Sequence, residues 1–360
     1  MNNENSLLAL VCDIDRANGE SVLAQTFLKI VTMETENTSI RVLSYKNHKN
    51  FFWCSFVGDY ARYLWLWRSL FIARWMNRYQ RLFIINYLPI WNVVTFVLVP
   101  KESWIAPLTG SILFLEPLTV DSNFKKRLFL RLRWLLIRFL SEASRAVIRL
   151  RGLRVIGATP SVGKFLGFRD TALPAIWLSS EVFEYLEKVS PGNTSKSEPS
   201  IKFVVYTNSH PLKNNDLLFD CLHHIDSLGI VGALIAPEQF RPEQFKNIKR
   251  YSNVPKHEMF NIIGSAEFAI QLSFEEAGLF AYEASCLGLK VIGFENTGCA
   301  LLPGFEELKR PSSSNCVISL KQEIVRIMSL KTLASERQNI AKEAMVCHEE
   351  AAKLYRAYFK

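Results

Sequence analysis

The chain of 360 residues lacks the cysteine patterns that bind zinc or build a disulfide framework. Its seven cysteines occur singly, no two are closer than 13 residues, and no C-x-x-C pair is present. Disulfide-stabilised secreted domains and zinc-ribbon proteins both need pairs or clusters of cysteine. The spacing excludes these classes and fits a reducing compartment.

Several common enzyme motifs are also missing. The sequence has no G-x-S-x-G, no P-loop and no G-x-G-x-x-G, which argues against the usual hydrolases, P-loop kinases and dinucleotide enzymes. His223, His224 and His257 have no companions at the spacing of metal ligands, so no protein-bound metal is expected.

A basic segment before the first apolar run is absent too, so a secretory signal is not expected. Residues 82–100 carry no charge and are long enough to be considered as a membrane span. Asn86, Pro89 and Asn92 interrupt this run. We interpret it as a buried strand, 82–88, followed by a helix that starts near Pro89, because proline fits a first helical turn.

Acidic residues are scarce in the first half of the chain. Residues 1–180 carry 23 Lys and Arg against 12 Asp and Glu, whereas residues 181–360 carry 20 against 22. Such asymmetry indicates a polyanionic partner, either a membrane surface or nucleic acid. No RNA-binding signature or zinc finger accompanies the basic residues, so we favour an anionic membrane and expect no nucleic acid.

Residues 124–150 predict the most amphipathic helix of the chain. At about 100° per residue, its arginines gather on one stripe and its leucines, with Phe139 and Ala146, on the adjoining one. Over 124–154 there are ten basic residues and one acid, Glu142. This basic helix, 124–154, is the predicted contact with the membrane. A core helix with an arginine-rich solvent face remains the alternative.

Strands alternate with helices along both halves, which predicts an α/β fold of two Rossmann-like domains with parallel sheets. Ser, Pro, Gly, Asn and Lys dominate the segment between them, the predicted linker at 186–200. We therefore expect an N-terminal domain at 1–185 and a C-terminal domain at 201–340. A final helix at 341–360 is expected to pack back on the N-terminal domain. The two domains are expected to face each other across a cleft, where ligands commonly bind.

Two glutamates, Glu275 and Glu283, bracket a glycine-containing turn after the apolar strand 268–273. They also fit solvated helix charges, but their surroundings favour a site, because ligands bind at the carboxyl ends of such strands. The N–H groups of Ala277, Gly278 and Leu279 would then point at a phosphate. Glu283 could accept hydrogen bonds from ribose hydroxyls. Glu275 could meet a sugar, where positive charge develops as a glycosidic bond breaks.

The complete pattern is strand, Glu, x-x-Gly-Leu, x-x-x-Glu-Ala, x-x-x-Gly and Lys-Val-Ile-Gly. It resembles the E-x7-E signature of retaining glycosyltransferases with the GT-B fold, particularly family 4, most clearly over 200–310. The resemblance implies that Lys213 contacts the donor diphosphate and that Gly19 lines the cleft. Asn208 or Ser209 stands where the family has an arginine. No cofactor is implied.

The resemblance implies a hexosyltransferase that moves a sugar, with retention, from a nucleotide-diphosphate donor. Glu275 would be the catalytic residue, and the domain at 201–340 would bind the donor. The acceptor would be a lipid-linked or other glycan hydroxyl in bacterial surface polysaccharide assembly, of lipopolysaccharide or capsule. The enzyme is expected to be cytoplasmic and peripheral on the inner membrane face. A non-catalytic scaffold or binding subunit of a glycan-assembly complex is the alternative, and the missing arginine motivates it. A nucleic-acid-binding protein is a third reading, which rests on the basic half alone.

Overall fold

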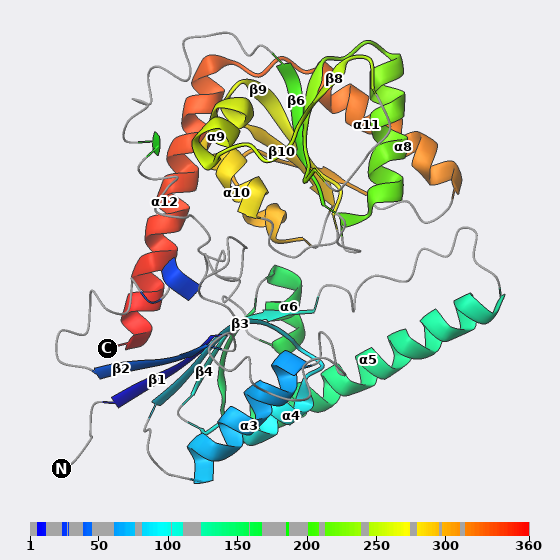
Figure 1. Cartoon of the computed structure of the whole chain (residues 1–360). Helices are drawn as coiled ribbons and strands as arrows, with labels where there is room; N and C mark the ends of the chain where they lie inside the picture. The colour runs from blue at the N-terminus through cyan, green and yellow to red at the C-terminus, as the bar shows by residue number, and fades with distance from the viewer. Residues whose placement is uncertain are drawn as a thin grey trace. The chain divides into compact units, whose positions relative to one another are not determined.

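The chain forms two compact units, each built on one parallel sheet. Unit 1 comprises residues 1–177 with 351–360, and unit 2 comprises residues 178–350 (Figure 1). The computed structural model describes residues 6–11, 24–26, 28, 39–44, 61–75, 81–101, 103–110, 124–157, 159–167, 185–186, 201–208, 213–238, 245–273, 279–294, 297–309 and 314–359. Nearly all of the predicted linker, 186–200, lies outside these residues.

The sheet of unit 1 has the strand order β2-β1-β3-β4-β5, and all neighbouring strands are parallel. Its strands are β1 (Ser6–Val11), β2 (Ser39–Ser44), β3 (Arg81–Pro89), β4 (Trp104–Thr109) and β5 (Arg154–Gly157). In this doubly wound order, the direction of winding reverses between β1 and β3. Ligands bind at the carboxyl ends of the strands that flank such a reversal.

Four helices of unit 1 accompany this sheet. They are α3 (Ala61–Trp75), α4 (Val93–Leu98), α5 (Phe124–Arg151) and α6 (Pro160–Leu166). The helices α3 and α4 contact each other, as do α4 and α5. Side chains from all four pack with the strands in one apolar core, which includes Leu66, Ile84, Phe96, Ile148 and Val162.

The strand and the helix predicted within residues 82–100 are both present, and the helix starts later than Pro89. Strand β3 runs through Pro89, and α4 begins four residues later. Asn92 is the reason, because its side-chain oxygen accepts a hydrogen bond from the Thr95 backbone N–H at 3.3 Å and so caps α4. The indole N–H of Trp67 donates to the same oxygen at 3.1 Å, which ties this cap to α3.

The sheet of unit 2 has the order β11-β10-β9-β6-β7-β8 and is also entirely parallel. Its strands are β6 (Ile201–Tyr206), β7 (Gly232–Ile235), β8 (Ile248–Tyr251), β9 (Ala266–Gln271), β10 (Lys290–Phe294) and β11 (Phe305–Leu308). Numbered from β6, this is the dinucleotide-fold order 3-2-1-4-5-6, with its reversal between β6 and β9. The sheet therefore places a ligand position at the carboxyl ends of β6 and β9.

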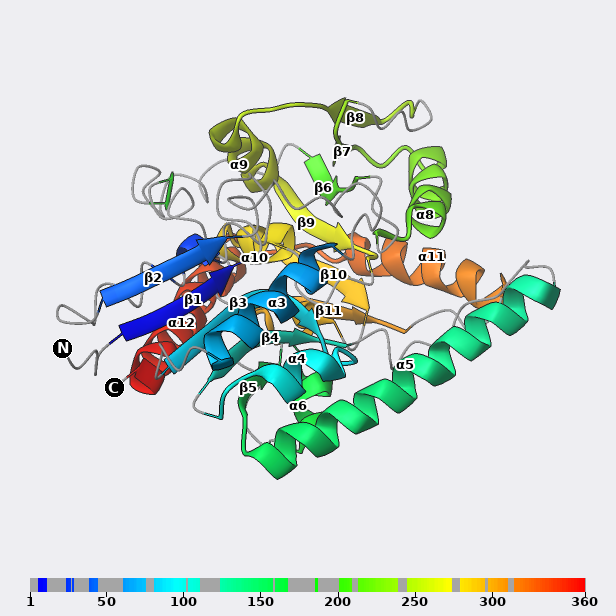
Figure 2. The same ribbon diagram turned by 60° about the horizontal axis from the view of Figure 1, so that its bottom comes forward.

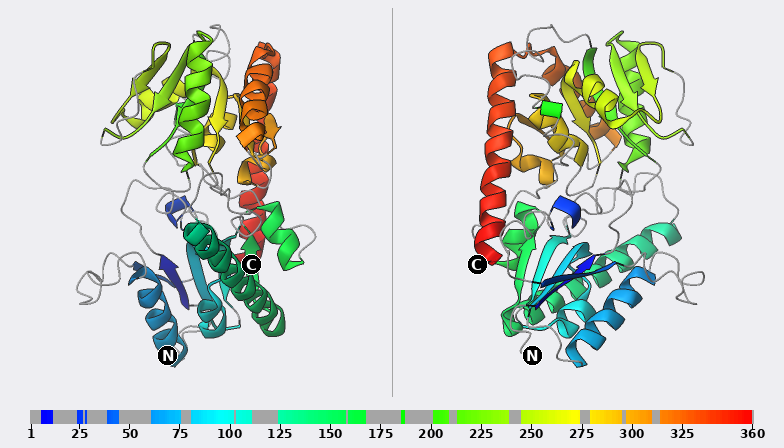
Figure 3. Two further views of the ribbon diagram at one scale, coloured as in Figure 1. Left: turned by 90° about the vertical axis from the view of Figure 1, so that its right-hand side faces the viewer. Right: turned by 60° about the vertical axis from the view of Figure 1, so that its left-hand side comes forward.

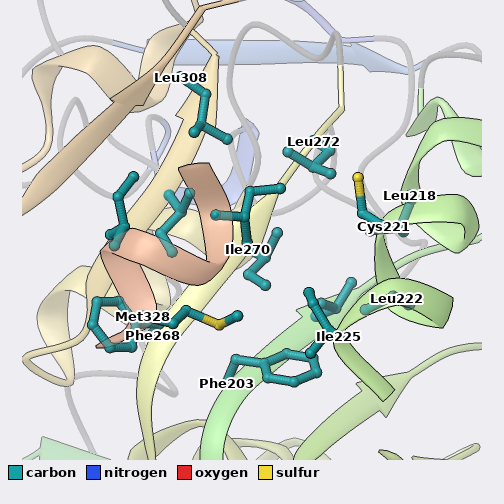
Figure 4. Packing of buried hydrophobic residues seen from close by; sticks show 14 of the residues in the cluster. Phe203, Leu218, Cys221, Leu222, Ile225, Phe268, Ile270, Leu272, Leu308 and Met328 are labelled. Atoms are coloured by element: carbon teal, nitrogen blue, oxygen red, sulfur yellow. The ribbon is translucent and has the colours of Figure 1, made fainter. Parts of the chain in front are cut away.

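The helices of unit 2 cover this sheet and close its core. They are α8 (Asn215–Ser227), α9 (Lys256–Gly264), α10 (Leu279–Cys286), α11 (Ser314–Ser329) and α12 (Ala334–Phe359), whose last residues, 351–359, are grouped with unit 1. Phe203, Phe268 and Ile270 project from the central strands toward Ile225 of α8 and Met328 of α11 (Figure 4). This core makes the central strands a rigid platform for the loops at their ends.

Helix α5 exposes its leucines. Leu128, Leu132, Leu135, Leu136 and Phe139 are exposed, and Leu150 is 86% exposed, whereas the helix packs on unit 1 through another face that includes Ser141 and Ile148. The alternative in which these leucines belong to the core is therefore wrong. The amino-terminal half of α5 extends beyond the other elements of unit 1 (Figures 2 and 3). Among the helices that the structure describes, none is long and apolar enough to cross a membrane.

The end of α10 depends on a glycine in a left-handed conformation. Gly288 has a φ of +82°, and a Cβ there would lie 2.5 Å from the carbonyl oxygen of Arg337 in α12. We expect Gly288→Ala to lower the free energy of unfolding by about 2–4 kcal/mol, because backbone strain and overpacking add. Gly229→Ala is the matched control, since its φ is +74° and its Cβ would meet nothing within 4 Å. Urea unfolding of both variants measures the difference. Equal losses of the free energy of unfolding would show that α12 moves away from the added methyl group at little cost.

Candidate functional site

The candidate site lies at the carboxyl ends of β6 and β9, where the winding of the unit 2 sheet reverses. Thr207 and Asn208, which follow β6, are both held by the side chain of Asn215. The Thr207 hydroxyl donates to the Asn215 side-chain oxygen at 2.5 Å, and the Asn215 amide donates to the Asn208 carbonyl at 2.7 Å. At the end of β9, the buried Gln271 amide hydrogen-bonds the buried Ser273 hydroxyl. Polar groups therefore gather at the edge of the sheet where a ligand is expected.

The predicted residue Lys213 is buried at this edge, with 5% of its surface exposed. Its Nζ lies 5.1 Å from the centre of the Tyr206 ring, which terminates β6. The Tyr206 ring in turn lies 6.0 Å from the ring of Phe280, the second residue of α10. Two stacked rings thus connect Lys213 to the first turn of α10, where the predicted residue Leu279 lies. Burying an ammonium costs free energy unless an anion or an aromatic ring lies beside it. Here the face of the Tyr206 ring provides one such contact.

The predicted residue Glu283 lies in the second turn of α10, and its side chain is 1% exposed. Its Oε1 lies 2.5 Å from the Nζ of Lys256, the first residue of α9. The helix around it is buried on every side from Phe280 to Cys286. Glu283 is therefore a buried, ion-paired carboxylate rather than a solvated helix charge.

Cys286, one turn after Glu283, is a buried thiol. Burial first, then the negative charge of Glu283 and the thiol of Cys347, raise the pKa of Cys286 to about 12. A thiol is a nucleophile only as the thiolate, so this cysteine acts as a small apolar core residue.

Several predicted residues lie outside the described part of the chain. They are Gly19, Glu275, Ala277 and Gly278. Of the predicted site residues, the structure thus describes Lys213, Leu279 and Glu283, and it places all three around α10 and the end of β6.

Sequence reasoning missed Lys256, Tyr206 and Phe280. A signal for Lys256 was available, because a lysine directly after Pro255 at the start of a helix opposes the helix dipole and needs an anionic partner nearby. The aromatic pair had no signal, since a tyrosine at a strand end and a phenylalanine in a buried helix are ordinary core residues.

No family model matches the chain, and no curated protein matches it by sequence. Solved structures are similar to it in fold. Sucrose-phosphate synthase from Thermosynechococcus elongatus is 10% identical with a TM-score of 0.56, and the match covers 99% of each chain. A glycosyltransferase from Rickettsia africae ESF-5 is 12% identical with a TM-score of 0.55, over 99% of this chain and 98% of that one. AviGT4, a glycosyltransferase involved in avilamycin A biosynthesis, is 12% identical with a TM-score of 0.50, over 98% of each.

At these identities the likeness shows the fold. The chain has the GT-B fold of two Rossmann-like domains, so the predicted fold class is confirmed. Membership of family 4 and the role of the E-x7-E pattern remain predictions.

Proposed function

We propose that the chain is a retaining, hexosyltransferase-type glycosyltransferase that takes its sugar from a nucleotide-diphosphate donor. In the transfer, the bond between the sugar's anomeric carbon and the diphosphate breaks, and a bond to an acceptor hydroxyl forms. The diphosphate leaves with the bonding electrons, and the proton of the acceptor hydroxyl passes to an oxygen of the departing diphosphate. No residue is assigned as general base. The proposed reaction uses no nucleotide besides the donor.

The observation that carries this proposal is the connection of Lys213 to α10 through Tyr206 and Phe280, at the carboxyl ends of β6 and β9. Lys213 would stabilise the negative charge that develops on the diphosphate. Glu283 would hold the ribose hydroxyls, and the N–H groups of residues 277–279 would face a phosphate. Glu275 would lie against the sugar as the catalytic residue. Gly19 is proposed to line the cleft, and no protein-bound metal or cofactor is part of the proposed reaction.

The acceptor in this proposal is a lipid-linked glycan of bacterial surface polysaccharide assembly, such as lipopolysaccharide or capsule. The exposed apolar face of α5, flanked by exposed arginines such as Arg131 and Arg138, supports a location on an anionic membrane. The enzyme would be cytoplasmic and peripheral on the inner membrane face, with helix 124–154 as its contact. No nucleic acid partner is proposed.

Nucleotide binding tests the proposal directly. We expect one of the nucleoside diphosphates UDP, GDP and ADP to raise the thermal midpoint, because a ligand at 100 times its Kd stabilises a fold by about 2.7 kcal/mol. Glu283→Gln should abolish the shift, measured against that variant's own midpoint without ligand. Glu267→Gln is the control, since Glu267 forms an ion pair with Lys202 at 2.7 Å near the start of β9 rather than its end. A shift that survives in Glu283→Gln would contradict the site.

A non-catalytic GT-B scaffold subunit is the second candidate, and Asn208 favours it. The resemblance expects an arginine at this position or the next, and the chain has Asn208 and Ser209, neither of which supplies a guanidinium for the diphosphate. If none of the three nucleotides shifts the midpoint of the wild-type protein, the scaffold becomes the better account.

A further inference from the structure

The ion pair between Lys256 and Glu283 joins two neighbouring helices of unit 2, α9 and α10, which contact each other (Figure 1). The lysine side chain is 33% exposed and the glutamate side chain 1% exposed. Solvent therefore reaches this pair at the lysine end, and residues 274–278, which precede α10, lie outside the described part of the chain.

The position of Lys256 is unfavourable for the helix that carries it. Lys256 is the first residue of α9 and follows Pro255, so its charge lies at the positive end of the helix dipole. The ring of Phe260, one turn later, lies 5.2 Å from Nζ and gives the ammonium a second contact. Phe260 is itself buried and packs at 5.2 Å against Tyr185. The ammonium is thus fixed between a carboxylate and an immobilised ring.

Stability gives little reason to keep such a pair. Desolvation cancels most of the attraction in a buried ion pair, and apolar side chains of similar size are often as good or better there. Glu283 lies in α10, and the first turn of this helix is connected to Lys213 through the rings of Phe280 and Tyr206. A fixed carboxylate at this place is better explained by a ligand that the carboxylate must meet in one orientation.

We propose that Lys256 is a positioning residue for the donor, which holds the Glu283 carboxylate oriented toward the ribose. This inference rests on the proposed function and adds to it a residue from a different helix. A carboxylate can accept several hydrogen bonds, and an ammonium on one oxygen fixes the plane of the group. Fixing it before the nucleotide arrives removes a reorganisation cost from binding. Lys256 thereby acts through Glu283 and makes no contact with the reacting atoms.

The readout is the preference for ribose over 2′-deoxyribose. UDP, GDP and ADP are each titrated by calorimetry beside their 2′-deoxy counterparts, into the full chain and its variants. For the nucleotide that binds, we expect the wild-type protein to prefer the ribose form about tenfold, because a hydrogen bond to a charged group is worth that much. Lys256→Met should lose most of this preference, as should Glu283→Gln. The double variant should lose no more than either single one, and Lys256→Arg should regain most of it.

Lys202 provides a matched control within the same unit. It pairs with Glu267 at 2.7 Å and lies 5.2 Å from the ring of Phe268, so its surroundings mirror those of Lys256. It lies near the amino ends of β6 and β9, away from the candidate site. Lys202→Met should therefore keep the full ribose preference, even if it lowers the thermal midpoint.

One result would overturn the inference and leave the proposed function standing. It is an unchanged ribose preference in Lys256→Met, including the case in which the ribose and deoxyribose forms both bind more weakly by the same factor. That result would mean that Lys256 does not act through Glu283. If the wild-type protein binds none of the three nucleotides, the proposed function fails first, and the role of Lys256 fails with it.

Discussion

Lys213→Met is expected to lower the rate of sugar transfer by about 10²–10³-fold, the usual cost of removing one preorganised charge from a developing anion. Methionine keeps the length and the apolar stem of the side chain, so the packing against Tyr206 survives while the charge is lost. The loss should fall mainly on kcat, because the diphosphate gains negative charge as the sugar departs.

The stability of the same variant should move the other way, or not at all. Lys213 is 5% exposed, and an ammonium in such surroundings carries a desolvation cost that a thioether does not. We therefore expect Lys213→Met to unfold at the same or a higher urea concentration than the wild-type protein. Full turnover in this stable variant would remove Lys213 from the site. Lys202→Met, which changes a lysine at the other end of β6, should leave kcat unchanged.

The central strands of unit 2 could be predicted because each is a short, uninterrupted apolar run. Phe203 to Val205 and Phe268 to Ile270 are all buried, as parallel strands covered on both faces require. The two edge strands could not be found in this way. The strand β8 reads Ile-Lys-Arg-Tyr and β11 reads Phe-Glu-Glu-Leu, and their central charges hide the pattern. Charged residues on edge strands discourage pairing with other chains. The same charges interrupt the apolar pattern from which a strand would be predicted.

The site shows a similar division. Glu283 was predicted from a linear spacing and Lys213 from its match to a lysine of the family that the sequence resembles, and their binding of a donor remains a prediction. Lys256 lies 27 positions before Glu283 in the sequence and belongs to a different helix. The packing of α9 against α10 brings the two charges together. A single sequence does not encode such a contact in any local period.

The orientation of α5 was also beyond the sequence. Its periodicity gives an arginine stripe and a leucine stripe, but either could face the core. Neither stripe faces the core. A third face of the helix does, because Ser141, Ser144 and Ile148 are buried while the described leucines of the apolar stripe are exposed. Helix α5 contacts α4, and the hydroxyl of Ser141 donates to the Ile137 carbonyl at 2.8 Å.

Replacing three exposed side chains of α5 with glutamine, in the variant Leu132→Gln, Leu135→Gln and Phe139→Gln, is expected to weaken binding to anionic vesicles by about 10²–10³-fold. Each side chain is more than half exposed, so it can still bury about half of its apolar surface, which is worth about 1–1.5 kcal/mol. The fold should be unaffected, since exposed positions change the free energy of unfolding by less than about 0.5 kcal/mol. Co-sedimentation with vesicles of phosphatidylglycerol and phosphatidylethanolamine measures the loss.

The pair Arg131→Gln and Arg138→Gln tests the charge beside the apolar face. At about 1 kcal/mol for each arginine, binding should fall by roughly 30-fold at low salt, and less at high salt. Substituting Ile318, Leu330 and Leu333, which are comparably exposed on unit 2, controls for a general loss of surface hydrophobicity. Their glutamine variant should bind as the wild-type protein does.

Three outcomes separate a membrane from other occupants of the α5 face. Wild-type binding that needs the three α5 side chains and phosphatidylglycerol together identifies a lipid surface, because neither apolar burial nor charge alone explains that combination. A wild-type dimer that becomes a monomer in the triple variant, without any vesicle binding, would assign the face to a second copy of the chain. Duplex DNA bound more tightly than vesicles at equal salt, with the triple variant unimpaired, would move the function of the basic half from lipid to nucleic acid.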